Sequence, residues 1–382
     1  MSRFKRICFG GFRRLYSLKL EIRPLMVMIG ANGVGKSSVL DAFSLLAASA
    51  AGKLNAQLSE FGGIVSTLTY DKAERISLSA DMEVSGQKPL CYELHLVPKG
   101  PSYSLEHEVL SQEQHDDKGP FKHIDSHHSD VRYFEKDKKK LVRPTWDHNP
   151  LETSLSQVPK MFRQPEDLRR ILASATLYHV LDVGQRAPVK LPQQMKPVQL
   201  PGNDGEDLVS FLYYLRETDP ARFETIEDTL KSAFPTFENL NFPPVAAGML
   251  AMAWKDENFK TPLYSHQLSE GTLRFLWLAA LLQSPGLSTV TMIDEPEVSL
   301  HPELLSLLAG LMREASQRTQ IIVATHSDRL IRFLRPEEVL VMDITEDGYA
   351  EAFWADSLDL DRWLAEYSLD EVWRMGRMGG RS

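Results

Sequence analysis

The chain has 382 residues, 43% of them hydrophobic, and a formal net charge of −9 at pH 7, which supports a buried core and argues against a protein coated in nucleic acid. No apolar run approaches the roughly 18–20 residues that a membrane-crossing helix needs, so we expect no direct membrane insertion. The two cysteines, Cys8 and Cys91, offer neither a disulfide framework nor a metal-site spacing, and the cytoplasm is the expected location.

The N-terminal segment alternates in a way that predicts strands over 4–9 and 16–29, on either side of a Gly-Gly turn. The second of these strands ends in the apolar run 25–29, and Gly-Ala-Asn-Gly-Val-Gly-Lys-Ser follows directly at 30–37. These eight residues match the phosphate-binding pattern G-x-x-x-x-G-K-[ST] at every fixed position. An apolar face over 37–51 predicts the helix that normally follows such a loop.

This loop indicates that the chain binds a nucleoside triphosphate. Its backbone N–H groups and the N-terminus of the following helix would face phosphate oxygens, and Lys36 would reach the β- and γ-phosphates. The hydroxyl of Ser37 is the expected ligand for Mg²⁺. The predicted nucleotide-binding residues of the loop are Gly30, Asn32, Gly33, Val34, Gly35, Lys36, Ser37 and Ser38.

The middle of the chain passes through β-rich, polar and helical stretches. The alternation of apolar and polar residues over 64–110 predicts strands, with a hairpin at 99–102. Residues 111–150 are polar, and we expect His123, His127 and His128 to lie in a solvated loop because no cysteine or carboxylate spacing there supports a metal site. Helices are predicted over 165–183 and 205–234, and the prolines between 159 and 201 exclude a long coiled coil.

Two segments carry an excess of basic side chains. Residues 1–20 hold six basic residues and no acidic one, and residues 156–200 hold seven basic residues against three acidic ones. Clusters of this kind either bind phosphate backbones or form ordinary solvated surface, and the sequence leaves both interpretations open.

Two acidic residues cap an apolar strand in the last third of the chain. The run 289–293 ends in Asp294-Glu295, and a carboxylate at the carboxyl end of such a strand lies beside the phosphate loop in an open α/β sheet. Asp294 is therefore a predicted ligand in the Mg²⁺ shell. Glu295 is the predicted general base that polarises the attacking water.

Three further segments complete the pattern. Leu-Ser-Glu-Gly-Thr at 268–272 precedes an apolar helix and, taken alone, is a helix N-cap with a following glycine. Its spacing of 26 residues before Asp294 matches the signature motif of ABC-type ATPases, and this resemblance implies that the helix N-terminus faces a phosphate through Ser269 and Gly271. Ser-Leu-His-Pro follows at 299–302. The strand 321–324 leads into Thr-His-Ser, where His326 is expected to contact the γ-phosphate or to hold the attacking water.

The order of these motifs resembles ABC-type ATPases of the RecF/SMC-like branch, including stand-alone heads of the overcoming-lysogenization-defect type. The resemblance is strong over 1–52 and 264–382 and loose between them. It implies an α/β P-loop NTPase head with an N-terminal β-rich lobe and a helical subdomain. In this scheme 1–110 is the first half of the ATPase core, 111–262 is an inserted β/helical subdomain without a coiled coil, and 263–382 is the second half.

The resemblance also implies an ATPase that forms a homodimer around two molecules of Mg-ATP. Each site would use Lys36, Ser37, Asp294, Glu295 and His326 from one chain and Ser269 with Gly271 from the other. Glu270 and Thr272 depart from the usual signature of the family. The glutamine of the family's Q-loop has two candidates here, Gln112 and Gln57.

The branch implies a role in DNA repair or anti-phage defence, with nucleic acid and a partner nuclease or toxin as expected partners. Two other interpretations stay open. In the first, the chain is the ATP-binding subunit of a membrane transporter. In the second, it is a regulatory switch that binds ATP and hydrolyses it slowly.

Overall fold

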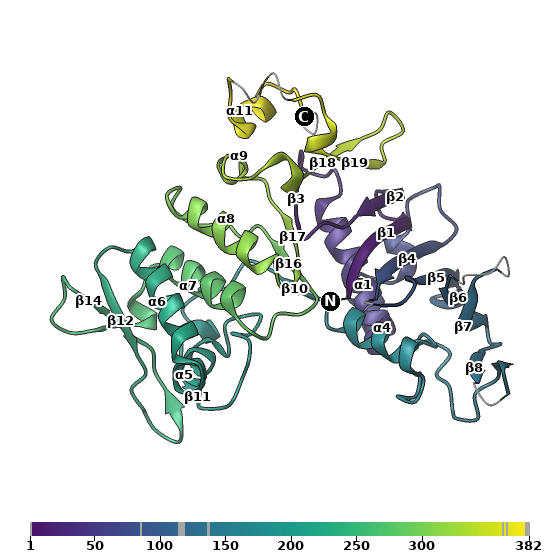
Figure 1. Ribbon diagram of the computed structural model, residues 1–382, viewed down its shortest axis with the longest axis horizontal. Helices are drawn as coiled ribbons and strands as arrows, with labels where there is room; N and C mark the ends of the chain where they lie inside the picture. Colours follow the sequence, from purple (N-terminus) through teal and green to yellow (C-terminus); the bar gives the residue numbers. More distant parts are fainter. Residues whose placement is uncertain are drawn as a thin grey trace.

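The structure is a computed structural model that describes residues 2–84, 86–113, 119–135, 138–360, 363 and 366–378. Two large sheets with helices around them form its frame (Figure 1). No helix in these described ranges is long and apolar enough to cross a membrane.

A six-stranded sheet crosses the middle of the molecule in the order β10-β16-β17-β3-β18-β19. Its first five strands run parallel, and the last is antiparallel to its neighbour. The bounds are β10 (Thr176–Tyr178), β16 (Val290–Asp294), β17 (Gln320–Ala324), β3 (Leu25–Ile29), β18 (Val339–Ile344) and β19 (Ala350–Trp354). All residues of β3 and β17 are buried, as expected for parallel strands that are covered on both faces.

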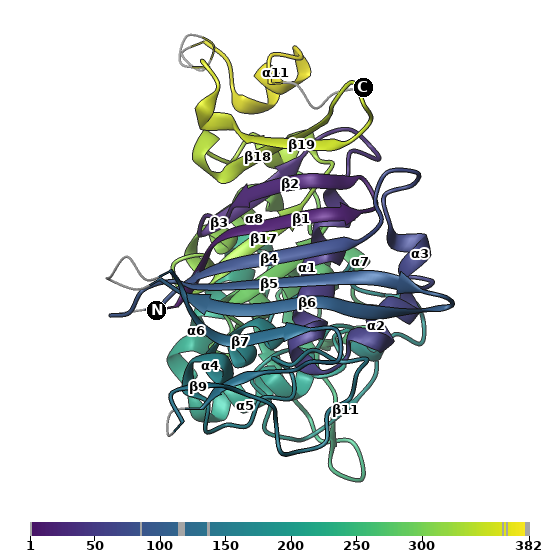
Figure 2. The same cartoon turned by 90° about the vertical axis from the view of Figure 1, so that its right-hand side faces the viewer.

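An eight-stranded antiparallel sheet forms the β-rich lobe, in the order β2-β1-β4-β5-β6-β7-β8-β9, and Figure 2 shows its outer face. Its inner face packs on α1 (Lys36–Ala51) and α4 (Arg163–Ala173). The strand bounds are β1 (Arg3–Phe12), β2 (Leu15–Glu21), β4 (Ile76–Glu83), β5 (Leu90–Lys99), β6 (Ser102–Gln112), β7 (Phe121–His127), β8 (Tyr133–Glu135) and β9 (Lys140–Val142). The core beneath this sheet reaches β3 through Met26 and Met28.

A second core lies on the other face of the central sheet, where Val27 and Ile29 of β3 pack among helices. Those helices are α5 (Leu208–Thr218), α6 (Pro220–Ala233), α7 (Glu270–Gln283) and α8 (Leu304–Ala315). Two small sheets accompany them, β12-β14-β15 and β11-β13. Their bounds are β12 (Phe237–Asn241), β14 (Ala253–Asp256), β15 (Leu263–Tyr264), β11 (Gln193–Gln194) and β13 (Met249–Leu250). In Figure 1 this helical part lies opposite the β-rich lobe.

Short helices complete the chain. They are α2 (Leu54–Glu60), α3 (Ile64–Thr67), α9 (Asp328–Ile331) and α11 (Leu369–Arg374), the last two lying beside β18 and β19 at the top of Figure 1. The predicted helix over 37–51 and the hairpin at 99–102 are confirmed, since Lys99 pairs with Ser102.

Several predicted boundaries are wrong. The predicted strand 16–29 is two strands, separated at 22–24 where Pro24 lacks the N–H that a sheet needs. Residues 64–67 are helical, although we predicted strand from residue 64. The helix predicted over 165–183 ends at Ala173, and 176–178 instead forms β10 at the edge of the central sheet.

The prediction of a solvated loop over 111–150 is wrong at 121–127, 133–135 and 140–142, which form strands. Strands β7, β8 and β9 extend the large sheet there, past residue 110, and His123 is only 8% exposed. Ile124 pairs with Tyr133, and both are buried against the inner core. Asp125 and His127 alternate with Ile124 and lie on the outer face of the sheet. Because this segment contains so many charged residues, its alternation of apolar and polar side chains is hard to recognise in the sequence.

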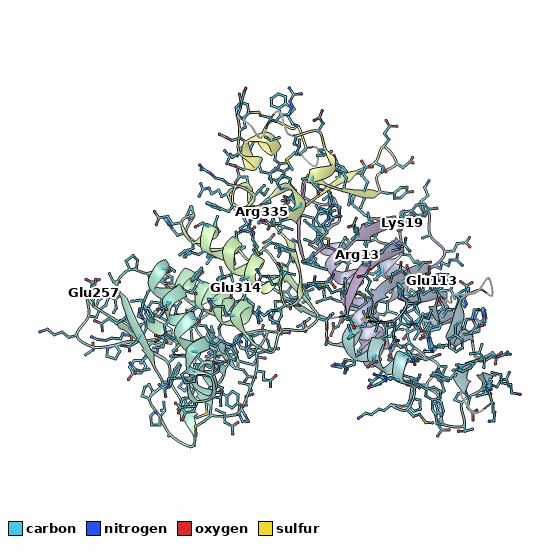
Figure 3. All side chains as sticks on the ribbon, viewed as in Figure 1. Arg13, Lys19, Glu113, Glu257, Glu314 and Arg335 are labelled. Atoms are coloured by element: carbon cyan, nitrogen blue, oxygen red, sulfur yellow. The ribbon has the colours of Figure 1, made fainter. Side chains whose placement is uncertain are left out.

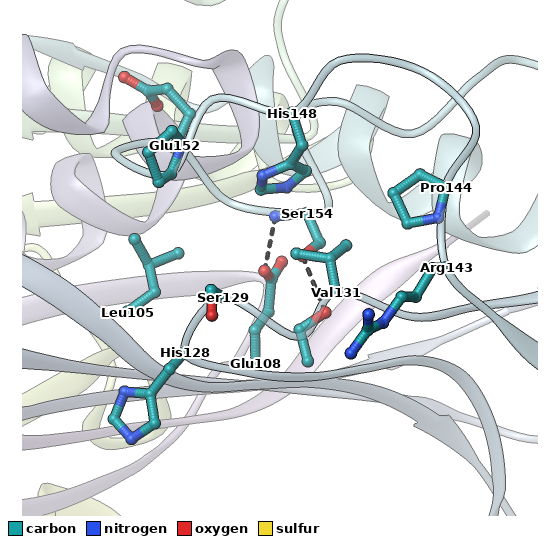
Figure 4. A pocket seen from close by; sticks show the side chains of 12 residues that line it. Leu105, Glu108, His128, Ser129, Val131, Arg143, Pro144, His148, Glu152 and Ser154 are labelled. Carbon is teal, nitrogen blue, oxygen red and sulfur yellow. Dashed lines mark hydrogen bonds between the residues drawn. The ribbon is translucent and has the colours of Figure 1, made fainter.

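The buried Glu108 of β6 ties the segment before α4 to this sheet (Figure 4). Its carboxylate accepts hydrogen bonds from the backbone N–H groups of Ser154 at 2.6 Å and Leu155 at 2.8 Å, and from the Tyr92 hydroxyl at 2.9 Å. Burial raises the pKa of Glu108, and these donors oppose that effect. The β-rich lobe and α4 are thereby held as one unit beside α1.

Candidate nucleotide-binding site

The loop between β3 and α1 has a backbone that only glycine adopts readily. Gly30, Gly33 and Gly35 have φ values of 149°, 79° and 113°, in the region that L-residues rarely occupy. A Cβ on Gly30 would lie 2.3 Å from the carbonyl oxygen of Met342, and one on Gly35 would lie 3.3 Å from the Cβ of Ala350. The glycine spacing of the sequence is therefore required by the geometry of this turn.

An open cavity of about 360 Å³ lies over this loop. Six of the predicted binding residues line it, namely Asn32, Gly33, Gly35, Lys36, Ser37 and Ser38, together with His326. Gly30 lies behind the loop against Met342. The side chain of Val34 is buried in the core, so only its backbone is available to a ligand.

The ammonium group of Lys36 is buried at the base of the cavity. It donates hydrogen bonds to the carbonyl oxygens of Gly30 at 2.6 Å and Ala31 at 2.9 Å. Burial lowers its pKa to about 8, and the negative charges of Glu295, Asp294 and Glu297 oppose that shift. This lysine therefore faces acidic residues that come from the other half of the chain.

Those acidic residues stand at the carboxyl ends of neighbouring parallel strands. Asp294 ends β16 in register with Ala324 of β17, and the N–H of Glu295 donates to the Ala324 carbonyl at 2.8 Å. Nε2 of His326 lies 3.7 Å from Oε1 of Glu295. Burial and the charge of Glu295 raise the pKa of Asp294. The strand order thus brings together the predicted lysine, acids and histidine.

The backbone of Glu295 is strained. Its φ of 49° lies in the left-handed region, which costs a residue with a Cβ about 1–3 kcal/mol and is found mostly at functional sites. Burial and the positive charge of Lys36 lower the pKa of His326, which keeps the ring neutral. A neutral ring nitrogen and a partly exposed carboxylate are suited to orienting a water molecule.

Glu297 is a residue of this site that sequence reasoning missed. It is half-buried, and its Oε1 accepts hydrogen bonds from the Thr325 hydroxyl at 2.5 Å and from the backbone N–H of His326 at 3.3 Å. It therefore fixes the turn that carries His326 to the loop that carries Glu295. The second glutamate of Asp-Glu-Pro-Glu was visible in the sequence, but its partners lie in the turn after β17.

Arg13 and Arg14 also line the cavity, although the sequence grouped them with a general basic segment. Arg13, labelled in Figure 3, pairs with Asp41 of α1. Arg14 donates to the carbonyl oxygen of Gly348 at 3.1 Å. Both cations lie at the mouth of the site, where a polyphosphate would be attracted.

Other members of the two basic segments are paired with acidic residues. Lys5 lies 3.3 Å from Glu83, and Arg6 donates to Asp81 at 2.7 Å. In the second segment the pairs are Arg163–Asp167, Arg169–Glu166, Arg170–Asp167 and Lys196–Asp207. These pairs favour ordinary solvated surface over a dedicated phosphate-binding face.

The predicted signature residues stand apart from this cavity. Ser269 caps α7 by accepting a hydrogen bond from the Thr272 N–H at 3.1 Å. A Cβ on Gly271 would lie 2.7 Å from the carbonyl oxygen of Ser299, so the loop 299–302 packs on the signature of its own chain. Among the described residues that line the lysine cavity, neither Ser269 nor Gly271 is found.

Neither candidate for the Q-loop lines the cavity within the described part of the chain. Gln112 donates to the carbonyl oxygen of Lys88 at 2.7 Å at the far end of β6. Gln57 lies on α2 and donates to Glu60 at 3.0 Å. The structure therefore supports neither of these two assignments.

Residues 25–332 match the protein family described as "AAA domain, putative AbiEii toxin, Type IV TA system". The fold is similar to the SMC head bound to the C-winged helix domain of ScpA, with a TM-score of 0.60 at 13% identity over 93% of this chain and 99% of that chain. It is also similar to the Smc head domain with an extended coiled coil bound to the C-terminal domain of ScpA derived from Pyrococcus furiosus, with a TM-score of 0.56 at 12% identity over 99% of each chain. No curated protein sequence matches the chain. At such identities the structural likeness shows the fold alone, which is that of a P-loop ATPase head.

Proposed function

The chain belongs to this AAA-domain family and has an SMC-head-like P-loop ATPase fold, and from that premise we propose that it is an ABC-type ATPase that binds and hydrolyses ATP between two copies of itself. One observation carries the proposal. Lys36 and His326 line the cavity, and Glu295, although not among its lining residues, acts on the charge of Lys36 and lies 3.7 Å from His326. The signature residues Ser269 and Gly271 have no such contact with the described residues of this group.

The residues present fit a nucleotide with its magnesium ion. The glycine turn leaves no room for a Cβ at Gly30. The Lys36 ammonium donates to the carbonyl oxygens of Gly30 and Ala31, and its third N–H is left to offer to phosphate oxygens. The hydroxyl of Ser37 and the carboxylate of Asp294 are the groups that would hold Mg²⁺. When bound, that ion neutralises phosphate charge and polarises the phosphoryl oxygens.

The protein's own groups divide the remaining work. Glu295 accepts a proton from the attacking water. His326, whose Nε2 lies 3.7 Å from Oε1 of Glu295, orients the same water. Glu297 is a positioning residue, because it holds the backbone of His326 rather than the reacting atoms. Arg13 and Arg14 add positive charge at the mouth of the cavity.

A homodimer would complete the site, because the signature of one chain can reach the phosphates bound by its partner. This arrangement makes a prediction about mixtures. Lys36→Ala and Ser269→Arg chains should each lack ATPase activity, and a mixture of the two should regain it. In a mixed dimer one of the two sites has an intact phosphate loop from one chain and an intact signature from the other.

The measurement is steady-state ATP hydrolysis of the separate and mixed proteins, with the molecular mass determined by light scattering with and without ATP. Restored activity together with an ATP-dependent dimer supports the shared site. If the mixture stays as inactive as its components while both variants fold, the shared site is wrong, although ATP binding by each chain is unaffected.

We further propose that the dimer acts in DNA repair or anti-phage defence by controlling a partner effector such as a nuclease or toxin. The family description names a toxin system, and the SMC heads with a similar fold are bound to ScpA, a partner protein. We expect duplex DNA at low salt to raise ATP turnover, and added salt to remove the effect. If DNA does not change the rate of ATP hydrolysis at any salt concentration, the proposed role of nucleic acid is wrong. The proposed control of a partner protein would not be affected by that result.

A further inference from the structure

Three metal-ligating side chains meet on the outer face of the eight-stranded sheet. His107 lies on β6, and Asp125 and His127 lie on β7. His107 pairs in register with His127, and Asp125 precedes His127 by two residues, so all three side chains leave the sheet on the same face. No member of this group is among the described residues that line the nucleotide cavity.

The ligand atoms of the three residues converge. Oδ1 of Asp125 lies 3.4 Å from Nε2 of His127 and 3.8 Å from Nε2 of His107. All three atoms lie within 4.8 Å of one another. A tetrahedral ion with bonds of about 2.1 Å holds its ligand atoms about 3.4 Å apart, so small side-chain rotations would complete the coordination.

Two of these atoms lack the hydrogen bonds that buried polar atoms normally have. Nε2 of His107 and Oδ1 of Asp125 are shielded from solvent, and neither has a hydrogen-bond partner among the described residues. Leaving such an atom unpaired costs about 1–3 kcal/mol. A direct His–Asp hydrogen bond would be shorter than the 3.4 and 3.8 Å separations, so a group between the residues accounts for these atoms better.

The surroundings hold the three side chains in this orientation. The Lys122 ammonium donates to the other oxygen of Asp125, Oδ2, at 2.9 Å, and so leaves Oδ1 facing the imidazoles. The rings of His107 and His127 stack with centroids 4.3 Å apart, and the ring of His95 meets that of His107 edge-on. Glu108, the next residue after His107, points to the opposite face of the sheet and into the cavity shown in Figure 4.

We propose that His107, Asp125 and His127 bind one divalent transition-metal ion that links β6 to β7. Two imidazole nitrogens and one carboxylate oxygen favour an ion such as Zn²⁺ over Mg²⁺ or Ca²⁺, which prefer oxygen ligands throughout. This ion is distinct from the magnesium that accompanies ATP, and its site neither uses nor requires the phosphate loop.

The test is titration of the full chain with ZnCl₂ by calorimetry, in buffer that contains excess Mg²⁺. We expect wild type to bind one Zn²⁺ and the variants His107→Ala, Asp125→Asn and His127→Ala to bind it at least about tenfold more weakly, since losing even a second-shell partner costs about 10–100-fold. His128→Ala is the matched control, because it removes an adjacent exposed histidine that is not part of the group.

Thermal unfolding supplies a second readout. Zn²⁺ should raise the Tm of wild type and of His128→Ala, but not that of the three ligand variants, because only a ligand that binds the folded state stabilises it. Binding of MgATP by the variants checks that they fold. A wild-type chain that binds no Zn²⁺, or a His107→Ala/His127→Ala double variant that binds it as tightly as wild type, would overturn the proposal.

Discussion

Glu295→Gln should lower the rate of ATP hydrolysis at saturating ATP by about 10²–10⁴-fold, the usual contribution of a general base, while ATP binding stays close to that of wild type. Glutamine has nearly the same size and keeps the backbone N–H that bonds Ala324, so the loop should keep its shape. The amide cannot accept a proton from water. Only the chemical step is therefore lost.

A second consequence follows from the proposed dimer. If hydrolysis is what separates the two chains, Glu295→Gln should stay dimeric after ATP is added, whereas wild type should return to monomer as ATP is consumed. Light scattering over the course of the reaction measures this difference. Glu257→Gln is the control, since this exposed glutamate lies in the helical part, far in Figure 3 from Arg13, which lines the cavity.

A Glu295→Gln chain that turns over ATP at the wild-type rate would show that another group is the base. Glu297 is the nearest alternative in sequence, but its Oε1 is already engaged by Thr325 and by the His326 backbone. Because it is half-buried and these hydrogen bonds hold the turn, it is poorly placed to take a proton from water. The structure therefore favours Glu295 between the two.

The nucleotide site could be predicted from sequence because each of its parts is local. The glycines at 30, 33 and 35, with Lys36 and Ser37, form one turn whose shape depends on residues adjacent in the chain. Asp294 ends one short apolar strand, and His326 lies two residues after the end of another. Parallel strands in one sheet end at the same edge, so the meeting of these segments also followed from general rules.

The features that could not be predicted from the sequence, the histidine–aspartate group and the role of Glu297, depend on contacts between strands that lie far apart in the chain. His107 and His127 are twenty residues apart in the chain, and only the register of β6 with β7 puts them side by side. In the sequence, Asp125 and His127 lie within the polar segment 111–150, for which we predict a solvated loop. In the same way, the role of Glu297 depends on its contact with Thr325, the residue after β17, which no spacing within the chain reveals.

Lys36→Ala should weaken ATP binding by at least about 30-fold, because removing one partner of a desolvated charge pair costs about 2–5 kcal/mol. The Lys36 ammonium is the cation at the base of the cavity, and Asp294, Glu295 and Glu297 all face it. Without that cation, phosphate oxygens would meet these acids unscreened. Calorimetric titration with a non-hydrolysable ATP analogue measures the change.

Two control variants distinguish a direct effect of Lys36 on ATP binding from a loss of folding. Lys36→Arg keeps the positive charge but not the compact ammonium that fits against the Gly30 carbonyl, so it should also bind ATP poorly while preserving the charge balance of the site. Lys53→Ala removes an exposed lysine just after α1 and should bind normally. Wild-type affinity in both Lys36 variants would rule out the phosphate-loop assignment.

The two binding sites should respond independently to these variants. A Lys36→Ala chain that loses ATP but still binds Zn²⁺ is folded in its β-rich lobe, since His107 and His127 come together only when β6 and β7 pair. A His107→Ala chain that loses Zn²⁺ but still binds ATP is folded around the central sheet. Loss of both ligands from either single variant would mean that the chain had unfolded, and the reciprocal pattern therefore separates a local defect at each site from a global one.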